Sequence, residues 1–357
     1  MDSTGGDAMA DAVRIGVVGT GIGVEHVRVF HGVPHAEVVA VCSAQRQRAR
    51  SVADRFGVPV ATDDWRDLLG PDVDALVVAT PPALHARIAL DAIAAGKHVF
   101  VEKPLAASLD EARAMRDAAR AAGVVHMVNF QLRFAALYAR AKALVDDGYL
   151  GGLAVADARM SLNPVDYLRS SEWSTSKAAW FTDAAQRGGF LGSSAGPHLA
   201  DLLLWFGGPV ESVAARTAVT RPSVTLAGGE PVAVAAEDAF LILLRFASGA
   251  LGTMRGVPIA HHHGQWTLEL DGLAGTLIAR DDVLLAATAA DREPVAVALG
   301  DEKPQDRDVI AGHFVEAIRA GAPAPAPNFD DGLAAQALLE AAVAAARSGR
   351  WVDVEPA

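Results

Sequence analysis

The tripeptide Glu102-Lys103-Pro104 is the segment whose residue types best suit chemistry. It follows residues 96–101, which end in the apolar run Val99-Phe100-Val101. Apolar side chains on successive residues predict a strand buried in a parallel sheet. Lys103 would then lie just past the carboxyl end of a central strand, the edge of an open α/β sheet where ligands bind. A cation held there by the stiff Pro104 suits a hydrogen bond to a substrate hydroxyl. A surface ion pair with Glu102 explains the tripeptide equally well.

His198 and Asp201 form a second candidate site, behind a glycine- and serine-rich segment. Ser194 is a plausible N-cap for the helix that follows. Because His198 and Asp201 are three residues apart, they share a face of that helix. A histidine can move a proton near neutral pH, and Asp201 could orient it. A core histidine bonded to a backbone carbonyl is the competing interpretation.

The loop Gly19-Thr20-Gly21-Ile22-Gly23 lies between an expected strand and an expected helix. In this context Gly19 permits a tight turn, and Gly21 lets a pyrophosphate approach the backbone at a positively polarised helix N-terminus. Val24 stands where the common G-x-G-x-x-G pattern has its third glycine, and Gly23 would take over part of that role. The loop predicts dinucleotide binding rather than a purely structural turn.

The end of the second expected strand bears on the choice of cofactor. An acidic residue there would accept the ribose 2′-hydroxyl of NAD, but residues 41–48 contain none. Ser43 could instead bond a 2′-phosphate, and Arg46 or Arg48 could pair with it. Alternatively, both arginines are simply solvated on the following helix. The pattern favours NADP over NAD.

Other polar and aromatic clusters are weaker candidates. In His261-His262-His263, neighbouring side chains of a strand point to opposite faces, and no nearby cysteine or pair of carboxylates completes a site, so we expect no metal. Trp180, with Trp173 and Phe181 nearby, could line a sugar-stacking pocket or cover a seam between domains.

Strand and helix patterns alternate through the first third of the chain. Strands are expected at residues 13–18, 38–42, 75–79, 96–101 and 124–130, and helices at 26–32, 44–56, 84–95 and 109–122. This alternation predicts an α/β fold with a doubly wound parallel sheet. The strand ends would bring the glycine loop, Thr80-Pro81-Pro82 and Lys103 to one edge.

The pattern changes after about Arg133. Strand-like runs dominate at residues 155–162, 213–219, 239–246, 251–256, 266–271 and 276–280, with helices expected at 135–147, 195–206 and 332–348. Grouped strands predict a second, α+β domain on a large, open, mostly antiparallel sheet. We therefore divide the chain into a disordered tail at residues 1–11, a dinucleotide-binding domain at 12–133 and a substrate-binding and oligomerisation domain at 134–357.

Composition excludes several functional classes. The formal net charge of −12 disfavours binding to nucleic acid or anionic lipid. No unbroken apolar stretch is long enough to span a bilayer, and the acidic first residues do not resemble a secretion signal. Cys42 is the only cysteine, so no intrachain disulfide can form. A cytoplasmic protein is the expectation.

Taken in order, these motifs resemble the Gfo/Idh/MocA oxidoreductases, which include glucose-fructose oxidoreductase and inositol dehydrogenases. The resemblance covers nearly the whole chain and rests on the glycine loop, Thr80-Pro81-Pro82 with His85, the segment around Lys103, and the glycine pair before His198. It implies an N-terminal Rossmann domain and a C-terminal domain whose open sheet often packs against another subunit, giving a dimer or tetramer. The implied reaction is hydride transfer between NAD or NADP and a hydroxyl carbon of a sugar, cyclitol or related polyol.

The resemblance also implies roles for individual residues. Lys103 would bond the reacting oxygen, and His198 would act as the acid/base. Asp201 would support substrate binding or local structure, and Asn129 and Arg133 lie where cofactor or substrate is often contacted. Residues that would contact the cofactor are Gly19, Gly21, Ile22, Gly23, Thr80, Pro81, Pro82, His85 and Glu102, together with Lys103.

Ser194 departs from the family pattern. Many of these dehydrogenases carry an aspartate four residues before the histidine, where this chain has serine. A serine holds no negative charge at neutral pH, so it cannot raise the pKa of His198 as a carboxylate would. His198 acting with Lys103 alone, or on a differently oriented substrate, is the favoured explanation. A nucleotide-sensing regulatory protein, or an enzyme that uses bound NAD(P) transiently for epimerisation or glycoside cleavage, is the alternative.

Overall fold

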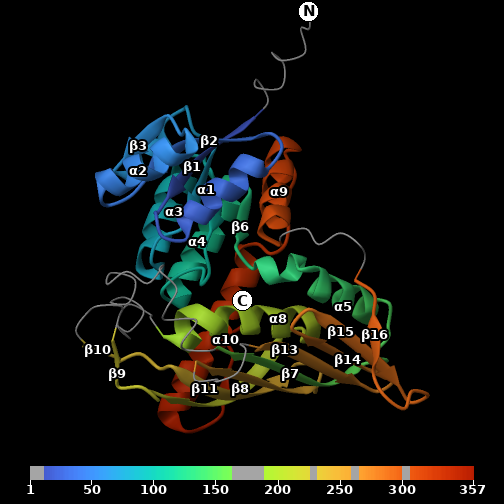
Figure 1. Ribbon diagram of the computed structural model, residues 1–357. Coiled ribbons are helices and arrows are strands. Elements are labelled where there is room, and N and C mark those ends of the chain that lie inside the picture. The colour runs from blue at the N-terminus through green and yellow to red at the C-terminus, as the bar shows by residue number, and fades with distance from the viewer. Residues whose placement is uncertain (1–11, 163–188, 226–230, 259–264, 300–305) are drawn as a thin grey trace, which may run out of the picture. The chain divides into compact units, whose positions relative to one another are not determined.

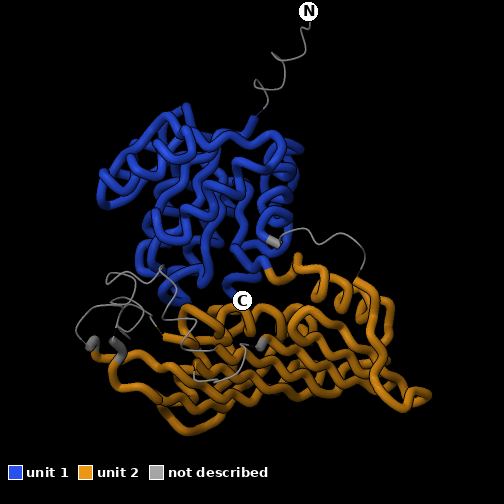
Figure 2. The backbone as a smooth tube through the Cα atoms, viewed as in Figure 1, with its two compact units in different colours: residues 1–131, 304–333 blue, residues 132–303, 334–357 orange. Residues whose placement is uncertain are grey.

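The computed structural model describes residues 12–162, 189–225, 231–258, 265–299 and 306–357. Two compact units divide the chain, Met1–Gln131 with Pro304–Leu333, and Leu132–Lys303 with Ala334–Ala357 (Figure 2). The sequence-based division at residue 133 placed Pro304–Leu333 in the second domain, whereas its contacts group it with the first unit. The expected tail at residues 1–11 lies outside the described residues. Among the described helices, none is both long and apolar enough to cross a membrane.

The first unit is built on a six-stranded parallel sheet with the order β3-β2-β1-β4-β5-β6. The strand order reverses between β1 and β4, the switch point at which α/β sheets of this type bind dinucleotides. The strands are β1 (Val13–Val18), β2 (Ala36–Cys42), β3 (Val60–Thr62), β4 (Ala75–Val78), β5 (His98–Val101) and β6 (His126–Val128). The predicted α/β class and doubly wound sheet are confirmed.

The central strands of this unit are buried because helices cover them. All four residues of β4 are buried, as the continuous apolar pattern predicts. Gly57 and Gly123 end two of the helices in the left-handed conformation, with φ values of 71° and 64°. The helices are α1 (Gly23–Gly32), α2 (Arg46–Phe56), α3 (His85–Ala94) and α4 (Leu109–Ala122).

Helix α9 (Asp306–Arg319) completes the core of the first unit and was not predicted from the sequence. It packs against α1 and β1. Its fully buried Phe314 lies 5.5 Å from the ring of Phe100 and 6.4 Å from that of Phe30, both in edge-on geometry. These three rings fix α1, and with it the glycine loop, against strand β5.

The second unit contains a nine-stranded sheet in the order β16-β15-β14-β13-β7-β12-β11-β8-β17. Only the β7–β12 pair in this sheet is parallel, so the predicted mostly antiparallel sheet is confirmed. Its strands are β7 (Leu153–Ser161), β8 (Val210–Ala218), β11 (Ala239–Phe246), β12 (Leu251–Val257), β13 (Gln265–Gly272), β14 (Gly275–Arg280), β15 (Val283–Thr288), β16 (Val295–Val297) and β17 (Val352–Asp353). A separate two-stranded sheet pairs β9 (Ser223–Thr225) with β10 (Pro231–Ala233).

One face of this large sheet is covered by helices (Figure 1). Helix α8 (Ala195–Gly207) packs on β7 and β12, and α5 (Ala136–Asp146) packs on β14 and β15. Strand β11 shows the resulting period of two, with Phe240, Ile242, Leu244 and Phe246 buried. The long helix α10 (Phe329–Ser348) follows α9 in the chain. The sheet thus places the helix bearing His198 on its covered face.

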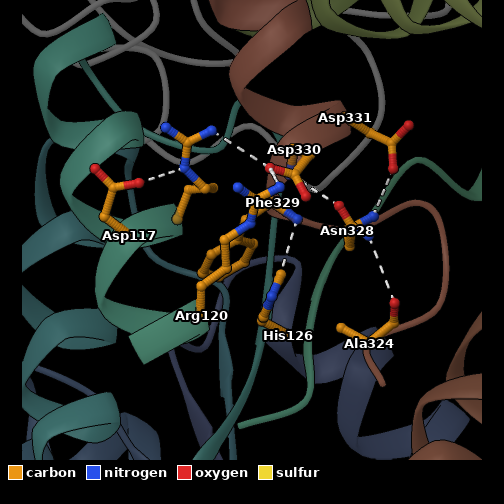
Figure 3. Close-up of polar contacts among 9 residues, drawn as sticks. Asp117, Arg120, His126, Ala324, Asn328, Phe329, Asp330 and Asp331 are labelled. Atoms are coloured by element: carbon orange, nitrogen blue, oxygen red, sulfur yellow. Dashed lines mark hydrogen bonds and ion pairs between the residues drawn. The ribbon is translucent and has the colours of Figure 1, made fainter. Parts of the chain in front are cut away.

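The proline-rich segment at residues 323–327 belongs to the first unit, and polar contacts hold the residues around it (Figure 3). Val128 donates its N–H to the carbonyl oxygen of Pro327 at 3.1 Å, and Phe329 donates its N–H to Nδ1 of His126 at 3.2 Å. The His126 and Phe329 rings lie 4.7 Å apart. Arg120 pairs with Asp330 at 2.8 Å. These contacts tie the start of α10 to strand β6.

His126 gives this contact a dependence on pH. Burial lowers the pKa of His126 from 6.5 to about 4, with Asp330 opposing the shift and Arg120 adding to it. The unfolded chain therefore binds a proton more readily than the folded one, so stability is fully present above pH 6.5 and is lost as pH falls toward 4. The maximum loss is about 3 kcal/mol, from the difference between the two pKa values.

We predict that His126→Asn will flatten the fall in stability between pH 6.5 and 4. The asparagine oxygen can accept the Phe329 N–H without titrating, although the lost ring contact lowers stability at every pH. Chemical denaturation measured across this pH range tests the prediction. His35→Asn, at an exposed position with φ of 60° that asparagine tolerates, is the control. A wild-type pH slope in His126→Asn would contradict this role.

Candidate functional site

The glycine loop connects β1 to α1 at the switch point of the first sheet. Gly19 has a φ of +117°, and a Cβ there would lie 2.2 Å from the carbonyl oxygen of Ala79, so only glycine fits. Its N–H donates to the carbonyl oxygen of Cys42 at 2.9 Å. A Cβ on Gly21 would meet no atom of the described chain within 4 Å. Helix α1 begins at Gly23, directly after the exposed Ile22.

This arrangement fits the diphosphate of a dinucleotide. The space over Gly21 is open, and the N–H groups at the start of α1 provide a polarised anion site. Beside the loop, the buried hydroxyl of Thr80 has no hydrogen-bond partner among the described residues. A buried hydroxyl without a partner is costly, and a bound ligand would remove that cost. Thr80, Pro81 and Pro82 follow β4, with Pro82 buried and Pro81 exposed.

The end of β2 carries the three residues considered for the 2′-position of the cofactor. The hydroxyl of Ser43 lies 3.0 Å from that of Thr20 in the glycine loop. Arg46 is the first residue of α2, and its side chain is 72% exposed with an ion pair to Asp63 at 3.9 Å. Arg48 is also exposed. Ser43 therefore lies beside the glycine loop, whereas both arginine side chains extend into solvent.

Lys103 follows β5 and is fixed through the buried carboxylate of Glu102. Glu102 Oε2 accepts the Lys103 backbone N–H at 3.1 Å. Glu102 Oε1 accepts the side-chain amide of Asn129 at 2.7 Å and lies 2.8 Å from Nε2 of His26. Burial alone would raise the pKa of Glu102, but the His26 hydrogen bond and the charges of His26 and Lys103 hold it well below its usual range. A carboxylate in this setting stays ionised.

His85 joins the ends of β4 and β5. Its ring is fully buried, Nε2 lies 2.8 Å from the carbonyl oxygen of Thr80, and Nδ1 lies 3.0 Å from that of Pro104. Burial lowers the pKa of His85, although both carbonyls act in the opposite direction. The sequence grouped His85 with residues that contact the cofactor, and the structure places it behind Thr80 and Pro104 with both nitrogens facing the backbone.

The second unit carries His198 and Asp201 on α8, which begins after the π-helical turn Phe190–Ser194. Asp201 is almost fully buried. Its Oδ1 and Oδ2 accept the Nε–H of Arg133, with Nε at 3.0 and 3.1 Å. His198 is 8% exposed, and its ring lies edge-on to that of Trp266 at 5.7 Å. Ser194 occupies the N-cap position, but its side chain makes no capping hydrogen bond to the helix. The carboxylate of Asp201 is thus engaged with Arg133.

Sequence reasoning missed His26 and Trp266 as members of these two clusters. His26 lies on the buried face of α1, three residues after Gly23, and a histidine among Val27, Val29 and Phe30 was the available signal. Trp266 lies at the start of an expected strand and gave no signal. Trp180 and His261-His262-His263 lie outside the described residues. Within the described ranges, no three His, Cys, Asp or Glu side chains form a cluster that could hold a metal ion.

The sequences of both units match a known protein family. Residues 13–130 match the model of an oxidoreductase family with an NAD-binding Rossmann fold, and residues 138–278 match the GFO/IDH/MocA C-terminal domain. A levoglucosan dehydrogenase of Pseudarthrobacter phenanthrenivorans is 31% identical, with 88% of each chain covered. A myo-inositol 2-dehydrogenase of Thermotoga maritima is 27% identical over 96% of this chain and 99% of that one.

A solved structure of levoglucosan dehydrogenase in complex with NADH has a TM-score of 0.86, with 27% identity and coverage of 97% of this chain and 100% of that one. This likeness extends over both units, and the glycine loop lies inside the matched NAD-binding fold. The chain therefore belongs to the Gfo/Idh/MocA family of NAD(P)-binding oxidoreductases.

Proposed function

We propose that this protein is an NAD(P)-dependent dehydrogenase that transfers a hydride between the nicotinamide and a secondary alcohol or ketone of a sugar, cyclitol or related polyol. The observation that carries the proposal is the fixed position of Lys103, whose backbone is held by a buried, ionised Glu102 at the carboxyl edge of the nucleotide-binding sheet. Relatives named for dehydrogenation of levoglucosan and myo-inositol support the substrate class.

Oxidation of a secondary alcohol removes a hydride from carbon and a proton from oxygen, leaving a carbonyl. The nicotinamide, when bound, supplies the acceptor for the hydride. Lys103 would donate a hydrogen bond to the reacting oxygen and stabilise the negative charge that develops there. His198 would take the hydroxyl proton, and in the reverse direction would return it. Because Ser194 replaces the usual aspartate, His198 would act without a carboxylate at that position.

Substitution of Lys103 and His198 tests their proposed roles in catalysis. Lys103→Met and His198→Ala should each lower kcat by about 10²-fold or more, the usual range for loss of an acid/base or oxygen-stabilising group. The dissociation constant of the cofactor, measured by nucleotide fluorescence, should stay nearly unchanged. Lys142→Met, at a lysine that pairs with Asp146 on α5, is the matched control and should retain wild-type kcat. Full activity in either site variant would overturn the assigned roles.

The residues at the end of β2 predict a preference for NADPH over NADH. Because no acidic residue ends β2 and Ser43 with Arg46 and Arg48 are available for a 2′-phosphate, kcat/KM should be higher with NADPH than with NADH. Arg46→Ala and Arg48→Ala should weaken NADPH binding by up to about tenfold each and leave NADH binding unchanged. Arg50→Ala, which removes an exposed arginine paired with Asp54 on the same helix, is the control. A higher efficiency with NADH than with NADPH would show the assignment to be wrong.

Exposed leucines on the second sheet predict that the chain forms an oligomer. The outer side of β11 and β12 exposes Leu241, Leu243 and Leu251, at 58%, 53% and 55%, and we propose that this face forms a subunit contact in a dimer or tetramer. Light scattering should give a multiple of the 37.0 kDa chain mass. Leu243→Glu should lower that mass, because it would bury an unpaired charge. Leu273→Glu, at the 83% exposed turn between β13 and β14, should not. Equal masses for both variants would exclude this face.

A further inference from the structure

His85 lies between two groups that accept hydrogen bonds but cannot donate them. The carbonyl oxygen of Thr80 faces Nε2 at 2.8 Å, and that of Pro104 faces Nδ1 at 3.0 Å. The two carbonyls belong to segments that follow different strands, β4 and β5. A neutral imidazole donates through one nitrogen only, whereas an imidazolium donates through both. Because burial lowers its pKa, the fully buried ring is neutral: it donates to one carbonyl oxygen, and its second nitrogen contacts the other. In this way the ring links the two strand ends.

Each linked segment bears a group that the proposed reaction uses. Thr80 has the buried hydroxyl beside the glycine loop that lacks a partner among the described residues. Pro104 directly follows Lys103, whose N–H is already held by Glu102 at 3.1 Å. The Lys103-Pro104 unit is thus fixed on its amino side by Glu102 and on its carboxyl side by His85. Displacement of the ring would free Thr80 and Lys103 to move independently.

We propose that His85 is a positioning residue that holds the Thr80 turn and the Lys103-Pro104 segment at a constant separation. It contacts neither cofactor nor substrate and acts through the two backbone carbonyls. The Thr80 side of the link governs cofactor binding, and the Pro104 side governs the placement of the Lys103 side chain. The inference rests on the proposed function, since it assigns Lys103 to the substrate oxygen and Thr80 to the cofactor.

Two substitutions separate the two sides. In His85→Asn the side-chain amide nitrogen can take the place of Nδ1, so it donates to Pro104 and the contact with Thr80 is lost. In His85→Gln the amide nitrogen can reach the place of Nε2, so it donates to Thr80 and the contact with Pro104 is lost. Both amides are neutral and always carry donors. The pair therefore tests each link without a change of charge.

The expected outcome is a split between binding and turnover. His85→Asn should raise the dissociation constant of NADPH about tenfold, the size of one lost hydrogen bond, with kcat at saturating cofactor within about threefold of wild type. His85→Gln should lower kcat about tenfold and keep the dissociation constant. The dissociation constant is read from nucleotide fluorescence, which needs no turnover.

His98→Asn is the matched control. His98 also joins neighbouring strands, since its Nδ1 accepts the N–H of Val125 at 2.9 Å, but it does so at the amino end of β5. It should alter the melting temperature and leave both the dissociation constant and kcat unchanged. If both His85 variants behave like His98→Asn, or if both lose binding and turnover equally, the proposal is overturned.

A measurement on the unsubstituted protein covers the case in which a variant does not fold. With ¹⁵N-labelled histidine, addition of NADPH should shift the ring nitrogen resonances of His85 and leave those of His98 in place. Unchanged His85 resonances in the presence of bound NADPH would overturn the proposal. Failure of the proposed function would look different, because the wild-type protein would then bind NADPH but turn over no polyol. The dissociation constants of NADPH for His85→Asn and His85→Gln would still decide whether His85 acts on the Thr80 side.

Discussion

The buried carboxylate of Glu102 is the interaction on which the first half of the site depends. A carboxylate removed from water is costly unless it is fully hydrogen-bonded, and here the partners come from α1, from the end of β6 and from the backbone of Lys103. Each partner is thereby fixed relative to the others. The packing of Phe314 from α9 against Phe30 and Phe100 holds α1 in the place from which His26 can reach the carboxylate. A polar network and an aromatic cluster thus position one lysine.

In the second unit the buried carboxylate is that of Asp201, and its charge is balanced by an ion pair with Arg133. Asp201 accepts Arg133 with both oxygens while both side chains are buried, and this arrangement fixes one face of α8. His198 lies one turn earlier on the same helix and packs against Trp266 of β13. Asp201 then acts on the position of α8 rather than as a free carboxylate beside the histidine. This geometry is compatible with serine at position 194, because the histidine is held by packing.

Family membership places this chain among oxidoreductases of sugars and cyclitols, and the roles that we propose for Lys103 and His198 agree with hydride transfer. In the proposed mechanism Ser194 bears on the proton-transfer step alone, since the glycine loop and the Glu102 network lie in the nucleotide-binding unit.

Features that depend on neighbours along the chain could be predicted from the amino-acid sequence. Periodicity predicted both sheets, because it depends only on the order of apolar and polar residues along each strand. The apolar run of β5 followed by Glu102-Lys103-Pro104 predicted where the lysine would lie. Such signals need only a few adjacent residues.

Tertiary structure decided the contacts between distant residues. His26 and Glu102 are 76 positions apart, and Arg133 and Asp201 are 68 positions apart. A local sequence pattern therefore could not predict either pair. The assignment of α9 to the first unit depended on Phe314 filling a gap between two rings that belong to other elements. His85 was recognised from its spacing, yet its role as a link became visible only when the carbonyls of Thr80 and Pro104 were placed on its two nitrogens. Burial and hydrogen bonding between distant residues are properties of the folded chain, and only packing fixes which partners meet.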